Sequence, residues 1–416
     1  MELPTRLDPA WITEALTATG TLPVRKRKLP AEVVVWTVVG ACLFGERSFM
    51  DVLRDYGLTA PTRRGSQQSP ATSGALSRAR KRLGAKAFKE LNRKAAQTWL
   101  NDASVTDHRY RGLRILAVDG TTFDLPDTAS NNEDFGKPKV KDGVPEPAFP
   151  KARAVVVMET RTHLVLDAEI GGYECTELGL LESDPDEGLL ARLPDSSLTI
   201  FDRYYRSWGM LRRLQGKGKE RHWILRARAD LVAKEVRRLG PGDRVVKIFP
   251  GYASRKADPT TPAEMTVREV TFTRGRTTFR ILTSLLDAAA YPARELAMLY
   301  GERWELELAF DNMKTEQRQA VPTLRSRLCE GVYQEFYGLL LAHNVVRFEM
   351  ARAAAQVGLP PIRISFHVAL RTIARHLHGC AVTTAPSRIA TREEALRHTL
   401  ASLVLPVRRS SRVYPR

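Results

Sequence analysis

Five short runs rich in Val, Ile and Leu constrain the fold of this chain more than any other feature. They occupy residues 113–118, 152–158, 164–170, 197–201 and 223–228. Runs of this length and composition are typical of β-strands. The later runs alternate with stretches of helical character, near 176–192 and 210–215. Strands that come first alone and then alternate with helices predict a mixed α/β core.

The regions around this core have different sequence patterns. The first hundred residues read as helical, a segment with Gly240-Pro241-Gly242 and short β-like runs reads as a β-rich insertion, and long helices are expected at about 293–319 and 330–356. We therefore expect a helical N-terminal domain at 1–105, a core in two parts at 106–228 and 281–350, a β-rich insertion at 229–280, and a helical C-terminal region with a basic tail at 351–416.

The charge balance indicates a polyanionic partner. The chain has 65 Lys and Arg against 47 Asp and Glu, a formal net charge of +18. A folded chain of this charge suits DNA, RNA or an anionic membrane, and composition alone does not choose among them. No apolar stretch approaches the roughly 20 residues that cross a bilayer, and no signal peptide is apparent. Four widely spaced cysteines without a CxxC pair favour reduced thiols, so we expect a cytoplasmic protein.

One basic stretch in the N-terminal region is a candidate for DNA contact. Residues 63–94 hold ten Lys and Arg but a single acid, Glu90. A solvated helix face is the simpler explanation for a charge run, but the excess of one sign favours contact with phosphates. The helical domain at 1–105 is therefore the expected DNA-binding domain, with Arg78, Arg80, Lys81 and Arg82 as the candidate residues.

A second cluster of candidates lies on the helix expected at 293–319. On a continuous α-helix Tyr300, Arg303, Glu307 and Lys314 fall within an arc of about 60°, beside an apolar stripe that can anchor the helix to a sheet. An ordinary surface stripe with an Arg303–Glu307 ion pair would have the same spacing. The pattern alone therefore leaves an active-site helix and a surface helix open.

Two aspartates favour the active-site helix over the surface helix. Asp119 and Asp202 each follow a strand-like run, so both carboxylates are expected at one edge of the sheet. Taken singly, Asp119 could be a turn residue and Asp202 a helix cap. Together with Glu307 they would form a repulsive nest of three carboxylates, which hard cations such as Mg²⁺ or Mn²⁺ relieve. Two such ions could activate a water or a 3′-OH for attack at phosphorus.

The spacing Tyr300-x2-Arg303-x3-Glu307-x6-Lys314 resembles the Y-R-E-K signature of the IS4 group of bacterial insertion-sequence transposases. The segments around Asp119 and Asp202 are similar to the aspartate segments of that family. The resemblance implies a ribonuclease H-like catalytic core interrupted by the β-rich insertion. It also implies that Asp119, Asp202 and Glu307 are the catalytic residues and ligands of two Mg²⁺ ions, while Tyr300, Arg303 and Lys314 hold DNA phosphates.

The function expected from these features is DNA transposition. The protein would bind the terminal inverted repeats of its element, cleave DNA there and join the freed 3′-OH to target DNA by a cut-and-paste route, as a homodimer associated with the bacterial nucleoid. Two alternatives remain open at this point. One is a DNA-binding regulator without catalysis, and the other is a metal-dependent nuclease that cuts but does not join.

Overall fold

The computed structural model describes residues 7–22, 29–45, 47–55, 71–140, 143, 145–216, 218–257, 259–319, 321–381 and 389–406. Two compact units make up the chain. The helical unit comprises Met1–His108, Arg161–Leu164 and Asp311–Arg416, and the sheet unit comprises Arg109–Thr160 and Val165–Phe310. The basic tail expected at the C-terminus lies outside the described residues.

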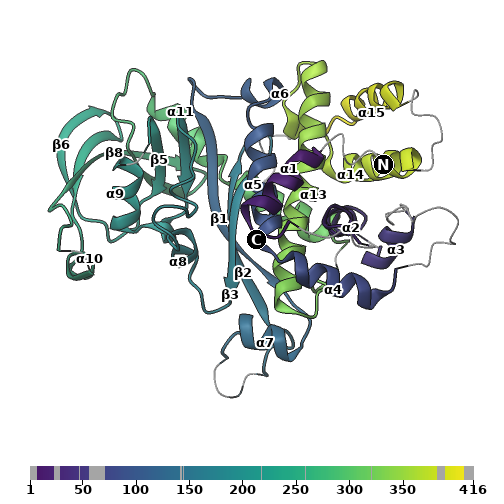
Figure 1. The fold of residues 1–416 in the computed structure, drawn as a ribbon. Helices are drawn as coiled ribbons and strands as arrows, with labels where there is room; N and C mark the ends of the chain where they lie inside the picture. The colour runs from purple at the N-terminus through teal and green to yellow at the C-terminus, as the bar shows by residue number, and fades with distance from the viewer. Residues whose placement is uncertain are drawn as a thin grey trace, which may run out of the picture. The chain divides into compact units, whose positions relative to one another are not determined.

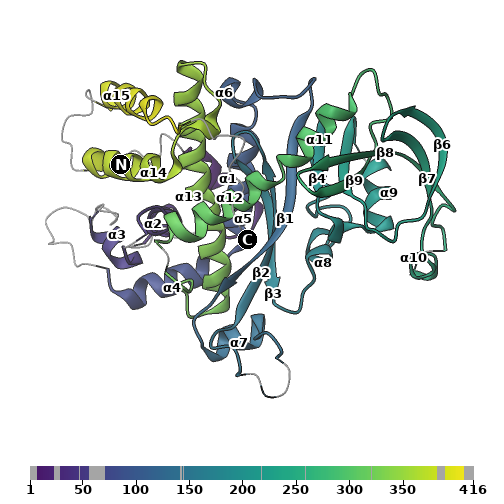
Figure 2. The ribbon, with the colours of Figure 1, turned by 180° about the vertical axis from the view of Figure 1, so that it is seen from behind.

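The helical unit is built around one long helix. Its elements are α1 (Pro9–Ala18), α2 (Ala31–Leu43), α3 (Phe49–Asp55), α4 (Ser73–Leu83), α5 (Lys86–Trp99), α6 (Ala103–Thr106), the π-helix η3 (Asn312–Gln317), α13 (Cys329–Gln356), the 3₁₀ turn η4 (Pro361–Arg363), α14 (Phe366–Ala381) and α15 (Ile389–Ser402). Helix α13 packs against α2, α5, α14 and α15 (Figures 1 and 2). No helix among the described residues is long and apolar enough to span a bilayer.

Burial along α13 explains why N-terminal and C-terminal helices share one unit. Most of this helix is buried on every side, which requires partners all around it. Gly338 lets α2 approach closely, because a Cβ there would lie 2.7 Å from Cγ1 of Val38. The expected helical regions at both ends of the chain are therefore present. The boundary expected at residue 350 falls inside α13, which runs unbroken to Gln356.

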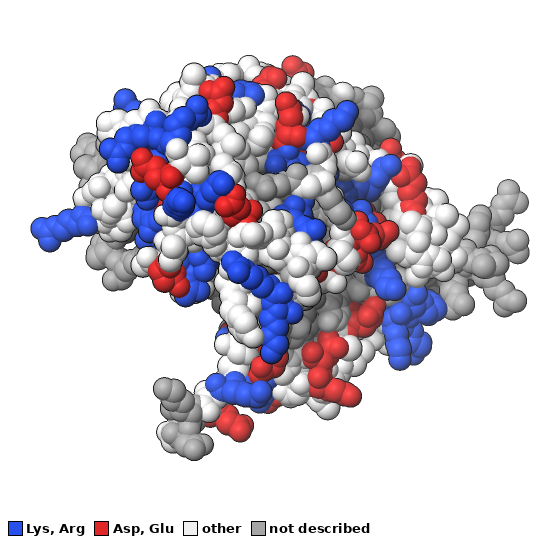
Figure 3. Space-filling view, turned by 90° about the vertical axis from the view of Figure 1, so that its left-hand side faces the viewer, with Lys and Arg blue, Asp and Glu red and all other residues white. Residues whose placement is uncertain are grey.

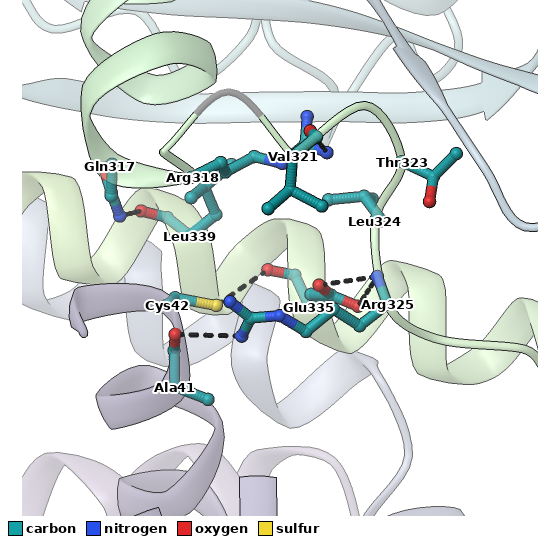
Figure 4. Close-up of a pocket in the computed structure, with 10 residues that line it drawn as sticks. All are labelled: Ala41, Cys42, Gln317, Arg318, Val321, Thr323, Leu324, Arg325, Glu335 and Leu339. Atoms are coloured by element: carbon teal, nitrogen blue, oxygen red, sulfur yellow. Dashed lines mark hydrogen bonds between the residues drawn. The ribbon is translucent and has the colours of Figure 1, made fainter. Parts of the chain in front are cut away.

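A small cavity of about 10 Å³ lies between α2, α13 and the segment that follows η3 (Figure 4). Buried Glu335 accepts hydrogen bonds from the backbone N–H groups of Arg325 and Ser326, both at 2.9 Å. The Arg325 guanidinium in turn donates to the carbonyl of Ala41 at 3.0 Å. A space of this size holds about one water. The hydrogen bonds around this cavity therefore hold the segment that follows η3 against both helices.

Cys42 lines the same cavity and is expected to be chemically inert in the folded protein. Burial, followed by the nearby Glu335 carboxylate, raises the pKa of its thiol to about 12. Cys175 is exposed. Since the thiolate is the nucleophile, iodoacetamide at pH 8 should modify Cys175 in the native protein and Cys42 only after unfolding. Peptide mass spectrometry measures both, and rapid native labelling of Cys42 would contradict its burial.

The sheet unit contains one nine-stranded mixed sheet in the order β3-β2-β1-β4-β5-β9-β8-β7-β6. The strands are β1 (Arg114–Asp124), β2 (Lys151–Glu159), β3 (Val165–Gly172), β4 (Ser197–Phe201), β5 (Arg221–Arg226), β6 (Ala233–Gly240), β7 (Asp243–Ile248), β8 (Met265–Arg274) and β9 (Thr277–Thr283). Strands β1, β4 and β5 are parallel, and every other pairing is antiparallel. The expected mixed α/β core is confirmed.

Helices cover both faces of this sheet. Those of the unit are α7 (Ala129–Phe135), α8 (Glu177–Leu181), η2 (Arg203–Tyr205), α9 (Trp208–Gly216), α10 (Tyr252–Ala257), α11 (Ala293–Gly301) and α12 (Trp304–Asp311). Side chains of β1 alternate between two cores: Leu116 and Val118 pack with residues of α8 and α9, whereas Ile115 packs with residues of α11. The two faces are seen from opposite sides in Figures 1 and 2.

The segment expected as a β-rich insertion extends the sheet at one end. It carries β6, β7, β8 and α10, and β9 crosses its expected boundary at residue 280 to pair with β5. Residues 229–280 hold eleven Lys and Arg against six Asp and Glu. Figure 3 views the molecule from this side and shows basic side chains with acidic ones among them. The outermost strand, β6, is largely exposed and charged, as is typical of an edge strand.

A buried ion pair anchors this extension. Arg268 on β8 is fully buried and donates to both carboxylate oxygens of Asp243, at 2.7 and 2.6 Å. Its remaining nitrogen donates to the carbonyl of Tyr291 at 2.7 Å, in the loop before α11. The guanidinium therefore joins β7 and β8 to the segment that leads into α11 and α12, the helices that carry Tyr300 and Glu307 with Arg303 between them.

Candidate active site

Asp119 lies in the middle of β1, not at its end. The strand continues to Asp124 because β2 pairs with it along that whole length, whereas pairing with β4 stops at Val118 and Phe201. Asp119 is thus the residue at which β1 loses its neighbour on one side. The expectation that the strand would end at Asp119 was wrong, because the Asp119-Gly120 dipeptide resembles a turn but has an antiparallel partner here.

Asp202 directly follows Phe201, the last residue of β4. Since Phe201 pairs with Val118 in parallel register, the next residues of the two strands, Asp119 and Asp202, are neighbours at the same sheet edge. The Asp202 carboxylate caps the 3₁₀ turn η2 and accepts the Arg203 backbone N–H at 2.6 Å. The register thus brings the two aspartates next to each other, although only Asp202 follows the end of its strand, and their catalytic role stays a prediction.

Glu307 reaches the same site through Arg303. The Arg303 guanidinium donates one hydrogen bond to Oδ2 of Asp119 at 2.6 Å and another to Oε1 of Glu307 at 3.1 Å. Arg303 is buried, while the Glu307 side chain is 42% exposed. The arginine therefore lies between two of the three predicted carboxylates and neutralises part of their repulsion.

The helix that carries these residues is interrupted, contrary to the expectation of one helix over 293–319. Helix α11 ends at Gly301, α12 begins at Trp304, and the π-helix η3 follows from Asn312. At the first break Glu302 accepts a hydrogen bond from Thr160 at 2.7 Å. The α-helical rotation of 100° per residue does not continue across these breaks. The expectation that Lys314 shares one helix face with Tyr300 and Glu307 therefore does not hold.

The remaining residues of the predicted signature occupy different settings. Tyr300 is buried at the end of α11 with its ring centroid 6.3 Å from that of Phe279, and burial raises the pKa of its hydroxyl. Lys314 lies in η3, within the helical unit. The structure thus groups Asp119, Arg303 and Glu307 directly by hydrogen bonds.

Electrostatics mark Asp119 as an unusual carboxylate. Burial raises its pKa to about 6, Arg303 and the Gly120 N–H oppose the rise, and the carboxylates of Glu177 and Asp202 add to it. With this pKa the carboxyl group is still mostly ionised at neutral pH, and a nearby cation favours the ionised form. In the described part of the chain no three His, Cys, Asp or Glu side chains are grouped tightly enough to hold a metal ion. Arg303 is the cation that contacts Asp119.

Sequence reasoning missed Glu177, which lies beside this pair of aspartates. A Cβ on Gly120 would be 2.1 Å from Cδ of Glu177, so the two residues are in close contact. Glu177 accepts a hydrogen bond from the Tyr205 hydroxyl at 2.9 Å and pairs with Arg153 at 3.5 Å. No spacing in the sequence marks it, because it comes from a short helix between β3 and β4.

A cleft of about 730 Å³ was missed as well. Its lining is rich in arginine and comprises Arg203, Tyr204, Arg226, Ala227, Arg228, Ala229, Asp230, Thr278 and Arg280. Arg203 and Tyr204 directly follow Asp202, and Tyr204 is 73% exposed. The cleft therefore begins at the sheet edge that carries the two aspartates.

The four basic residues predicted for DNA contact on α4 divide into two groups. Arg78, Lys81 and Arg82 are exposed. The Arg80 guanidinium donates to Gln334, Ser326 and the Gly331 carbonyl, each at 3.0 Å, and lies 4.2 Å from the centre of the Phe49 ring. Arg80 thus joins α4 to α13, and the exposed three remain candidates for DNA contact.

Two family models match the chain. Residues 110–345 match the Transposase DDE domain, and residues 1–93 match the Insertion element 4 transposase N-terminal region. The first match covers most of the sheet unit, including all three predicted carboxylates. The protein is therefore a DDE transposase, an enzyme that acts on DNA phosphodiesters, and such enzymes generally use divalent metal ions.

Relatives specify the family further. The chain is 34% identical over 412 residues to the transposase InsG for insertion sequence element IS4 of Escherichia coli, covering 99% of this chain and 90% of that protein. It is 32% identical to the putative transposase InsZ of the same organism, over 56% of this chain and 73% of the relative. The protein belongs to the IS4 family of transposases.

A solved structure of a piggyBac transposase synaptic complex with hairpin DNA aligns with 95% of this chain and 84% of its own, at 13% identity and a TM-score of 0.44.

Proposed function

We propose that this transposase binds the terminal inverted repeats of its own insertion sequence, cleaves DNA there and joins the freed 3′-OH to target DNA. The observation that carries the proposal is the meeting of Asp119 and Asp202 at one sheet edge, with Glu307 linked to Asp119 through Arg303. Retention of all three carboxylates disfavours an inactive DNA-binding regulator.

The order and directions of the first five strands support a ribonuclease H-like core. Strands β3, β2 and β1 are antiparallel neighbours, and β4 and β5 continue the sheet in parallel from β1. The carboxyl ends of adjacent parallel strands are favoured places for catalytic groups in α/β folds. The β-rich extension, in this proposal, is an insertion between the second aspartate and the glutamate.

Asp119, Asp202 and Glu307 would hold the divalent cations. Their carboxylate oxygens are the hard ligands that Mg²⁺ and Mn²⁺ prefer, and the raised pKa of Asp119 marks a buried carboxylate that favours a nearby cation. When bound, two ions would supply an activated oxygen nucleophile and stabilise the leaving oxygen. The chain's own part is to hold the carboxylates at the sheet edge and, with Arg303 and Tyr300, to orient the DNA phosphates.

The arginine-lined cleft would hold the DNA backbone next to these carboxylates. Arg226, the last residue of β5, and Arg228, two residues further on, both line this cleft, and Arg228 is exposed. Arginine forks onto phosphate oxygens, and neutralised phosphates release counterions. Exposed Arg78, Lys81 and Arg82, together with Lys314, would bind phosphates elsewhere on the chain.

Replacing both Arg226 and Arg228 by Ala should weaken binding to a terminal-repeat duplex. The slope of log K against log salt should fall by about 1 for each phosphate that the variant no longer neutralises. Fluorescence anisotropy measured at low and at moderate NaCl concentration gives both quantities. Arg192→Ala, at an exposed arginine outside the cleft, is the matched control. An unchanged slope in the double variant would exclude the cleft as a phosphate site.

The joining step separates a transposase from a nuclease that only cuts. The test is a strand-transfer assay in which pre-cleaved terminal-repeat DNA is incubated with the protein, Mg²⁺ and a supercoiled plasmid. Covalent joining of the 3′ ends to the plasmid is the expected result, and cleavage without any joined product would favour the nuclease. Because two ends must react together, we further propose that a homodimer performs this reaction.

A further inference from the structure

Glu177 is the strongest feature of the molecule that the proposed chemistry leaves unused. It comes from the first turn of α8, far from the three predicted carboxylates in sequence. Its side chain is 32% exposed and lies against the backbone of Gly120, the residue that follows Asp119. The absence of a side chain at Gly120 is what allows this contact, since a Cβ would be 2.1 to 2.6 Å from three atoms of Glu177.

Two further contacts connect Glu177 to the turn that follows Asp202 and to β2. Its Oε2 accepts the hydrogen bond of the Tyr205 hydroxyl at 2.9 Å, and its Oε1 lies 3.5 Å from Nη1 of Arg153 on β2. Tyr205 is buried and stands three residues after Asp202. Burial raises the pKa of the tyrosine hydroxyl far above its ordinary value, so it remains a hydrogen-bond donor at working pH.

We infer that Glu177 is a positioning residue that fixes the Asp119 strand against the turn that follows Asp202. Gly120 contacts it from one side and Tyr205 from the other, so the carboxylate links the backbones that carry both aspartates. A displacement of about 1 Å at a reacting centre can lower a rate about 100-fold, which makes such a link consequential. The inference rests on the proposed role of the two aspartates.

The test compares Glu177→Gln, Glu177→Ala and Tyr205→Phe in the full-length protein, with Asp119→Asn as the reference for the proposed active site. Single-turnover cleavage of a terminal-repeat duplex is measured against Mg²⁺ concentration, and DNA binding is measured without divalent ions. Glutamine keeps an oxygen that accepts from Tyr205, whereas alanine removes it. Glu174→Ala, at an exposed acid three residues away, is the matched control.

The expected result is a loss of cleavage of roughly 10- to 100-fold in Glu177→Ala, a smaller loss in Tyr205→Phe, and a rate within about threefold of wild type in Glu177→Gln. The double variant Glu177→Ala/Tyr205→Phe should be no slower than Glu177→Ala alone, because both changes break one link. DNA binding should stay within about twofold throughout.

Three outcomes would overturn the inference. Equal loss in Glu177→Gln and Glu177→Ala, with a higher Mg²⁺ requirement, would make Glu177 a metal ligand. Loss of DNA binding and of the cooperative melting transition in Glu177→Ala would make its role purely structural. Wild-type rates in every Glu177 variant would leave it no role. If Asp119→Asn also cleaved at the wild-type rate, the proposed active site itself would fail.

Discussion

Glu307→Gln should lower Mg²⁺-dependent cleavage of a terminal-repeat duplex by roughly 1,000-fold or more, with DNA binding retained. Loss of a residue that only hydrogen-bonds to a metal ligand typically lowers metal affinity or activity about 10- to 100-fold. Loss of a ligand itself should lower activity further, because the glutamine side chain lacks the anionic oxygen that the cation requires. The amide is nearly isosteric and its oxygen can still accept from Arg303, so the hydrogen bond that spans 3.1 Å in the wild type need not be broken.

The matched control for this prediction is Glu305→Gln on the same helix, α12. Two residues along an α-helix correspond to a turn of about 200°, so Glu305 faces another direction from Glu307. Cleavage by a gel assay and binding by anisotropy are measured for both variants. Equal cleavage by Glu307→Gln and wild type would remove Glu307 from the site, and binding without cleavage by wild type itself would favour the regulator.

Arg268→Ala should destabilise the protein by about 3 to 5 kcal/mol, the typical cost of removing one partner of a buried ion pair. The change leaves the Asp243 carboxylate buried without its two hydrogen bonds and also frees the carbonyl of Tyr291. Urea denaturation followed by circular dichroism measures the loss. Because Arg268 anchors the loop before α11, cleavage should fall together with stability.

Two comparisons make the Arg268 prediction specific. Arg274→Ala, at an exposed arginine on the same strand, should change the free energy of unfolding by less than about 0.5 kcal/mol. The double variant Arg268→Met/Asp243→Leu should recover much of the loss, since apolar replacement of a buried pair is often neutral. A loss below about 1 kcal/mol in Arg268→Ala would mean that the pair is dispensable.

Local patterns in the sequence predicted much of this protein correctly. The runs at 113–118, 152–158, 164–170, 197–201 and 223–228 all lie on or overlap β1 to β5, because β-branched residues favour a buried extended backbone. The Y-R-E-K spacing identified the family, since it records which residue types occur at fixed separations and needs no three-dimensional information.

Other features depended on contacts between distant segments. Whether β1 stops at Asp119 is decided by β2, and the breaks around Glu302 and Asn312 interrupt a helix that the apolar pattern alone would continue. Arg80 reads as one more surface cation until α13 supplies its hydrogen-bond partners.

The sequence by itself therefore determined the family and the strands of the core, because these depend on local propensity and on spacing along the chain; the roles of Asp119, Asp202 and Glu307 stay a prediction from the same spacing. Tertiary structure alone decided that Arg303 bridges Asp119 and Glu307, that Glu177 lies against Gly120, and that arginines from β5 and its neighbours line one cleft. The physical reason is that hydrogen bonds, burial and charge interactions act between groups close in space, whatever their separation in sequence.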